Sequence, residues 1–178
     1  MSLRFLARSA LCVAVVTLAA SSIPACAGAS SAPPGKPTVA DFTLETVEGK
    51  TASLSDYTGK NVVMIDFWAT WCEPCLSAMP HLTEIYNRHK DQGFVILSIA
   101  MDGPDTVAEV RSYVQRQALP FPVLLDQESR AVSLYNPRRS APFSVILGRD
   151  GSVISKHDGF QAGDQVQIEK DVVEALAK

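Results

Sequence analysis

Asn-Val-Val-Met-Ile-Asp-Phe-Trp-Ala-Thr, residues 61–70, runs directly into Trp-Cys-Glu-Pro-Cys, residues 71–75. The first segment is apolar on both faces, which predicts a strand buried in a sheet that is covered on two sides. The second carries two cysteines three positions apart where a helix is expected to begin. Two such thiols can close a small disulfide and reopen it. The stretch therefore predicts a redox-active pair at the junction of a buried strand and a helix.

The two cysteines are expected to have different roles. Only a thiolate attacks a disulfide, and the free N–H groups at a helix N-terminus favour an anion. Cys72 lies at that position, so we expect it to be the nucleophile. Cys75 lies nearly one turn further into the helix and should be the more buried thiol, which resolves the mixed disulfide. Pro74 restricts the turn, and the charge of Glu73 opposes ionisation of Cys72, which argues against a strongly oxidising protein.

Two other uses of this cysteine pair fit the sequence less well. A structural disulfide between positions i and i+3 closes too short a loop to stabilise a fold by much. A zinc site needs four ligands, and the sequence contains no second Cys-x-x-Cys and no close pair of histidines. We therefore expect no metal at these cysteines.

Length and charge limit the classes of function. The chain has 178 residues, enough for one domain with a sizeable core. Its net charge is −3, and no basic run suits binding to nucleic acid. We therefore expect no nucleic-acid partner.

The N-terminus predicts export. Arg4 and Arg8 precede an apolar stretch at residues 10–20, which is typical of a secretory signal peptide over residues 1–26. Ile-Pro-Ala-Cys at 23–26 is similar to a lipoprotein processing box, which would make Cys26 the lipidated first residue. Ordinary cleavage within the same small-residue tract is the alternative.

The segment after this leader suits a flexible tether. Residues 27–38 are rich in Ala, Ser, Pro and Gly and would precede a folded domain at residues 39–178. Of the four cysteines, Cys12 would be lost with the signal peptide, which leaves Cys72 and Cys75 as the pair within the domain. An exported domain whose only cysteine pair is reactive points to thiol–disulfide exchange, with localisation in the bacterial envelope, periplasmic or anchored by lipid.

Patterns along the domain alternate between strand and helix. We expect an N-terminal hairpin over residues 39–54 that turns at Gly49, and strands near residues 62–67, 94–100, 121–125, 143–147 and 152–155. Helices are expected to follow Cys72, to begin with a capping box at Thr106 and to occupy residues 127–135, and Asp164 could cap a last helix. This order predicts an α/β fold, a central mixed sheet flanked by helices.

At this point the domain resembles thioredoxin-fold proteins of the TlpA/ResA-like class, which are exported, membrane-tethered thiol–disulfide oxidoreductases. The resemblance covers roughly residues 39–178. It depends on Asp-Phe-Trp-Ala-Thr-Trp-Cys-Glu-Pro-Cys at 66–75, on Met79-Pro80, and on Ala-Pro-Phe at 141–143. The added N-terminal hairpin distinguishes this class from plain thioredoxins.

The resemblance implies a client-binding surface around the cysteines. It implies that the Ala141–Pro142 bond is cis and that the Ala141 backbone pairs with an extended client strand. Trp71, Glu73 and Pro74 would lie on the same surface. Packing of Trp71 around the active-site turn, as for Trp68, is the other expectation.

Asp66 is the third residue that the resemblance singles out. It would be a buried acid beneath the cysteines that helps to move the proton of Cys75, and burial would suit its pKa to that work. A structural hydrogen bond at a strand edge is the alternative. ResA-like sequences often carry an acid three positions after the second cysteine, but here that position is Ala78, so proton transfer would depend on Asp66, or on Glu73 and solvent.

The implied activity is reduction of disulfides in envelope proteins, without a cofactor. The clients would be apocytochrome c or a copper-site assembly protein, and the electrons would come from a membrane thiol transporter of the DsbD or CcdA kind. Two alternatives stay open. A thiol peroxidase would need Thr at the place of Ala69, and a Cu(I)-binding module would need a third ligand, for which His157 is the candidate.

Overall fold

The computed structural model describes residues 39–178. The predicted signal peptide, the lipidation site Cys26 and the tether all lie outside the described residues. Within them, seven strands form one sheet in the order β2-β1-β5-β4-β3-β6-β7. The strands are β1 Thr43–Thr46, β2 Thr51–Ser53, β3 Val62–Trp68, β4 Phe94–Ala100, β5 Val123–Leu125, β6 Phe143–Leu147 and β7 Val153–Asp158. The helices are α1 Glu73–His89, α2 Val107–Gln117, α3 Arg130–Tyr135 and α4 Asp164–Leu176.

The sheet is mixed, as the sequence predicts. Strand β3 runs parallel to β4, and β4 runs parallel to β5. Strand β6 is antiparallel to β3 and to β7, and the hairpin of β1 and β2 joins the sheet through β5. Helices α1 and α2 are the crossovers between the parallel strands, so both helices begin near the carboxyl edge of β3 and β4.

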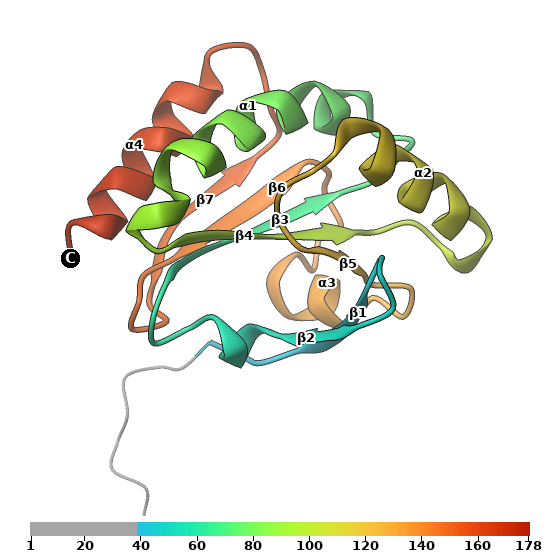
Figure 1. Ribbon diagram of the computed structural model, residues 1–178, viewed down its shortest axis with the longest axis horizontal. Coiled ribbons are helices and arrows are strands. Elements are labelled where there is room, and N and C mark those ends of the chain that lie inside the picture. The colour runs from blue at the N-terminus through green and yellow to red at the C-terminus, as the bar shows by residue number, and fades with distance from the viewer. Residues whose placement is uncertain (1–38) are drawn as a thin grey trace, which may run out of the picture. The chain divides into compact units, whose positions relative to one another are not determined.

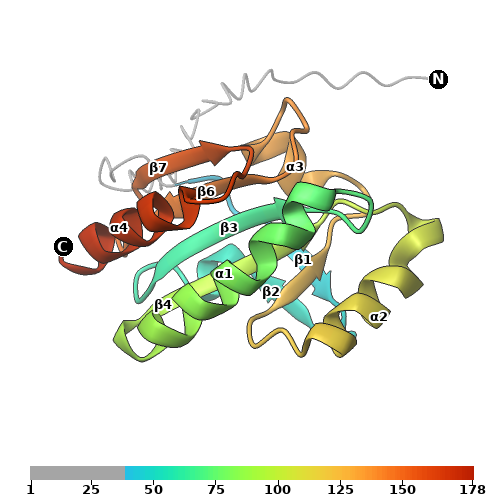
Figure 2. The same ribbon diagram turned by 90° about the horizontal axis from the view of Figure 1, so that it is seen from above.

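Helices cover both faces of the sheet (Figure 1). Helices α1, α2 and α4 lie on one face and α3 on the other, and Figure 2 shows α1 running along β3 and β4. Side chains of β3 alternate between these layers: Met64 and Trp68 belong to the core cluster shared with α1, α2 and α4, whereas Ile65 and Phe67 belong to the cluster shared with α3. All seven residues of β3 are buried, and all except Asp66 are apolar, as expected for a strand covered on both faces.

The turns confirm some local predictions and correct others. Gly49 has a φ of 80° in the β1–β2 hairpin, and Gly93 has a φ of 89° after the segment that contains α1. Thr106 is the N-cap residue of α2, as predicted, but the capping box does not form, because the Thr106 hydroxyl donates to the Gly103 carbonyl. The prediction for the last helix is wrong: Gly163 is the N-cap residue and Asp164 is the first residue of α4.

Strand β7 is longer than predicted. It continues to Asp158, which brings His157 into the sheet opposite Ser144. None of the helices between residues 39 and 178 has the length and apolar content that crossing a membrane requires.

Candidate active site

Cys72 and Cys75 form a disulfide at the start of α1. The sulfur atoms are 2.06 Å apart and the Cα atoms 5.3 Å apart. Cys72 is the N-cap residue, and its Sγ accepts a hydrogen bond from the Cys75 N–H at 3.3 Å. Both cysteines are buried in this oxidised form, with a relative exposure of 4% for Cys72 and 1% for Cys75. Cys72 therefore retains the larger exposure, and it lies where backbone N–H groups stabilise a developing negative charge.

The turn that precedes the cysteines is anchored to the end of β4. The Thr70 N–H donates to Asp102 Oδ2 at 3.0 Å, and the Thr70 hydroxyl donates to Asp102 Oδ1. The Cys72 N–H also donates to the Ala69 carbonyl at 3.1 Å. Sequence reasoning missed Asp102. The available signal was an acid just beyond a buried strand that lies parallel to the strand of the motif.

The two tryptophans of the motif have opposite environments. Trp68 is fully buried against Tyr113, with ring centroids 5.2 Å apart. Trp71 is 67% exposed, so the expectation that it packs around the turn is wrong. Glu73 and Pro74 are also exposed, so three exposed residues of the motif surround the buried Cys72.

The loop before β6 contains a cis peptide bond between Ala141 and Pro142, as the resemblance implied. Pro142 is buried, and Ala141 packs against the core cluster that contains both cysteines. Asn136 holds Ser140, the residue before Ala141, through two hydrogen bonds. Its Oδ1 accepts from the Ser140 N–H at 3.1 Å, and its Nδ2 donates to the Ser140 carbonyl at 2.7 Å. Asn136 is buried, and no sequence pattern had indicated it.

Asp66 lies in the middle of a polar row that crosses the sheet. Its neighbours in register are Ser98 on β4 and Ser144 on β6, and Ser144 is in turn opposite His157 on β7. Asp66 is only 3% exposed, and burial raises the pKa of its carboxyl to about 7, with Ser98 opposing the shift. Even so, neither Asp66 Oδ2 nor Ser98 Oγ has a hydrogen-bond partner among residues 39–178.

A cavity of about 10 Å³ adjoins this carboxyl. Asp66, Ala78, Pro142, Ser144 and His157 are among the residues that line it. Its volume is at the lower limit for one water molecule, and the polar groups of the row are suitable partners for one. Ala78 opens this space because it has no side chain beyond Cβ.

Two of the three histidines are paired with acids, and the third, His81, packs against Phe160. His157 Nε2 is 3.0 Å from Asp171 Oδ2, and His89 Nε2 is 2.8 Å from Glu169 Oε1. Within the described part of the chain, no three His, Cys, Asp or Glu side chains are grouped so that they could hold a metal ion. The structure thus places His157 next to Asp171 and in the row of Asp66.

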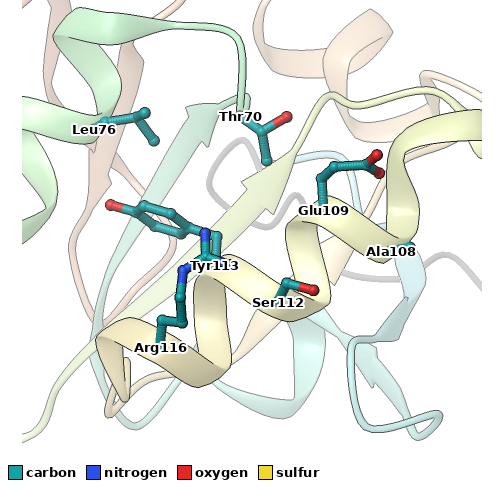
Figure 3. Close-up of a pocket in the computed structure, with 7 residues that line it drawn as sticks. All are labelled: Thr70, Leu76, Ala108, Glu109, Ser112, Tyr113 and Arg116. Carbon is teal, nitrogen blue, oxygen red and sulfur yellow. The ribbon is translucent and has the colours of Figure 1, made fainter.

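A groove of about 350 Å³ lies beside the motif, between the first turns of α1 and one face of α2 (Figure 3). Thr70 and Leu76 come from the motif side, and Glu109, Tyr113 and Arg116 come from α2. Because Thr70 is fixed by Asp102 and Tyr113 packs on Trp68, the groove is bounded by anchored residues.

Known proteins with related sequences or structures identify the family of this chain. The model of the AhpC/TSA family matches residues 36–157. Thiol-disulfide oxidoreductase ResA of Bacillus cereus is 35% identical over 127 residues, which is 71% of this chain and 71% of that protein.

Two solved structures are similar in fold. A crystal structure from Chlorobium tepidum, assigned to the thiol:disulfide interchange protein DsbE, has a TM-score of 0.71 and 29% identity, covering 78% of this chain and 95% of that one. The exposed lipoprotein thioredoxin Etrx1 of Streptococcus pneumoniae has a TM-score of 0.61 and 32% identity, covering 74% and 99%. The chain therefore belongs to the AhpC/TSA family and, within it, to the TlpA/ResA-like thiol–disulfide oxidoreductases of thioredoxin fold.

Proposed function

We propose that this oxidoreductase reduces disulfides of proteins in the bacterial cell envelope through Cys72 and Cys75. The observation that carries the proposal is the disulfide at the N-cap of α1, in which Cys72 keeps the larger exposure and lies between the exposed Trp71 and Glu73. A nucleophile must be reachable by a client, whereas the resolving thiol needs only to reach the nucleophile.

The reaction needs the dithiol form of the protein. The Cys72 thiolate attacks one sulfur of the client disulfide, a mixed disulfide forms, and the other client sulfur leaves as a thiolate. The Cys75 thiolate then attacks Cys72 Sγ, which restores the Cys72–Cys75 disulfide and releases the second client thiolate. Two electrons pass from the protein to the client, and no cofactor takes part.

Asp66 would manage the proton of Cys75. Its pKa of about 7 allows the carboxyl to accept or release a proton near neutral pH, which is the property that a general base or acid requires. Ala78 leaves no acid in the adjoining cavity to share this work. The Ala141 backbone and Pro142 would support the client strand on the other side of the cysteines, with Trp71, Glu73 and Pro74 on the facing rim.

The sequence around the domain supports an envelope location. Residues 1–26 would be a signal peptide and 27–38 a tether, with Cys26 as the lipidation site. One structural relative is an exposed lipoprotein, which agrees with this arrangement. We infer that a membrane thiol transporter of the DsbD or CcdA kind returns electrons to the disulfide, and that the clients belong to cytochrome c maturation or copper-site assembly.

Trapping distinguishes the roles of the two cysteines. The Cys75→Ala variant lacks the resolving thiol, so it should accumulate mixed disulfides with its clients that dithiothreitol releases and mass spectrometry identifies. The Cys72→Ala variant is the matched control and should trap fewer proteins. If Cys72→Ala traps as much or more, the assignment of roles is wrong.

The reduction potential tests the direction. A reductant must have a potential well below that of the strong oxidant DsbA, which is about −120 mV. Equilibration of the purified protein with glutathione redox buffers measures this value. A potential near that of DsbA would contradict the proposed reductive role.

A further inference from the structure

The groove between α1 and α2 carries two charges without partners. Glu109 and Arg116 are exposed, and within residues 39–178 neither has a hydrogen-bond or ion-pair partner. Four other arginines of this part of the chain, Arg88, Arg111, Arg130 and Arg149, each contact an acid or a backbone carbonyl, whereas Arg138 and Arg139 are exposed like Arg116 but lie outside the groove. Glu109 and Arg116 are thus available to a bound molecule.

The groove also has an apolar floor. Leu76 and the ring of Tyr113 are partly buried against the core cluster that contains both cysteines. Burial raises the pKa of the Tyr113 hydroxyl and the nearby charge of Arg116 opposes that shift, so the cation lies close to this ring. Figure 3 shows Arg116 and Tyr113 side by side along one wall, with Thr70 toward Glu109. An apolar side chain between two charged ones would match this lining.

The topology determines which of the two charges of the groove lies nearer the cysteines. Helix α2 follows β4, so its first turn lies at the same edge of the sheet as the turn that carries Cys72. Glu109 is in that first turn, and Arg116 is in the last turn, further from the cysteines. Seven residues of helix separate the two charges by about 10.5 Å, which an extended chain spans with about three residues.

We propose that this groove binds the extended segment that flanks the reactive cystine of a client, with a basic residue opposite Glu109 and an acidic residue about three positions further out, opposite Arg116. The proposal rests on the function proposed above, and it adds a rule for choosing clients. The apolar residue between the two charges lies on Leu76 and Tyr113. The groove is separate from the loop at Ala141 and Pro142, so one client could occupy both.

Paired peptides test the charge order. The two cystine peptides of a pair have identical composition. One carries Lys near the cystine and Glu three residues further out, and the other has these two residues exchanged. One pair carries the charges on the N-terminal side of the cystine, and a second pair carries them on the C-terminal side. The pre-reduced protein is mixed with each peptide, and the second-order rate of disulfide reduction is divided by that of hydroxyethyl disulfide, which is too small to span the groove. This ratio cancels any change in the reactivity of Cys72.

For one of the two flanks, the wild-type protein should reduce the peptide with Lys near the cystine about fivefold faster than the peptide with the exchanged charges. A ratio of this size is in the range that two exposed ion pairs can give. The double swap Glu109→Lys with Arg116→Glu keeps the net charge and should invert the preference. The double swap Lys170→Glu with Glu174→Lys on α4 is the control and should keep the wild-type order.

Each other outcome has a distinct meaning. If hydroxyethyl disulfide is reduced but charge order has no effect on either flank, or the Glu109 and Arg116 swap leaves the preference unchanged, the groove proposal is overturned and the proposed function stands. Failure to reduce any disulfide overturns the function itself. A change of sedimentation coefficient in the swapped protein would identify a second copy of this chain as the occupant, which also overturns the proposal.

Discussion

Replacement of Asp66 by Asn should stabilise the protein, and by more at high pH than at low pH. Burial raises the pKa of the Asp66 carboxyl from 3.8 to about 7. In the unfolded chain the pKa returns to its ordinary value, so between these two values the folded protein keeps a proton that the unfolded chain has released. The free energy of unfolding therefore falls as pH rises through this window, and the loss is complete above the folded pKa.

The magnitude follows from the size of the shift. About three pKa units at 1.36 kcal/mol each give a total penalty of about 4 kcal/mol above pH 7, of which roughly 1–2 kcal/mol is already present at pH 5. Asparagine has nearly the same shape and does not titrate. The gain in unfolding free energy of Asp66→Asn over the wild type should therefore be about 2–3 kcal/mol larger at pH 8 than at pH 5.

Urea unfolding followed by circular dichroism, with the disulfide intact, measures this difference at pH 5, 6.5 and 8. Asp105→Asn, at an exposed acid before α2, is the control and should show no such change with pH. A gain that is the same at all three pH values would refute the reasoning. So would a variant that becomes relatively less stable as pH rises, because the folded state would then favour the charged carboxylate.

Three further predictions concern single side chains. Asp126→Ala should destabilise the fold by about 2–4 kcal/mol in urea unfolding, because this buried carboxylate accepts from the N–H groups of Arg130 and Val132 at the start of α3. Asp102→Ala should slow reduction of client cystines and lower stability by about 1–3 kcal/mol, because Thr70 loses its anchor. Trp71→Ala should leave the thermal midpoint within about 2 °C but slow reduction of a protein disulfide more than that of hydroxyethyl disulfide, since Trp71 is 67% exposed.

Local patterns predicted the parts of the fold that depend on local physics. The buried strand β3 is visible as a run that is apolar except at Asp66, and the β1–β2 hairpin is visible through Gly49, because each depends on only a few neighbouring residues. The position of Cys72 at the head of α1 is likewise local. Residue spacing was less informative about helix capping. The Thr106 hydroxyl donates to the Gly103 carbonyl and the Asp164 carboxylate accepts from the Gln161 N–H, so both side chains bind the preceding loops.

The residues that hold the site in place could not be predicted from the sequence, because their contacts depend on the tertiary structure. Asp102 is 32 positions from Thr70, and Asn136 acts on a loop whose course depends on the packing of α3. Neither contact leaves a periodicity or a motif in one sequence. The exposure of Trp71 also depends on how the turn leaves the sheet, which the pair of tryptophans does not reveal.

The energetics of Asp66 bear on its proposed role. Most of β3 is apolar, and a buried carboxyl there lowers stability at neutral pH, which a structural residue would not need to do. A structural hydrogen bond does not account for Asp66, because the contact with Ser98 offsets only part of the pKa rise that burial causes, and Asp66 Oδ2 has no hydrogen-bond partner in the described part of the chain. Residues that lower stability are typical of functional sites, where activity requires a group that the fold alone would not favour. Since the carboxyl changes protonation near neutral pH and lies on the face of β3 that α1 covers, the stability lost at Asp66 is consistent with transfer of the proton of Cys75.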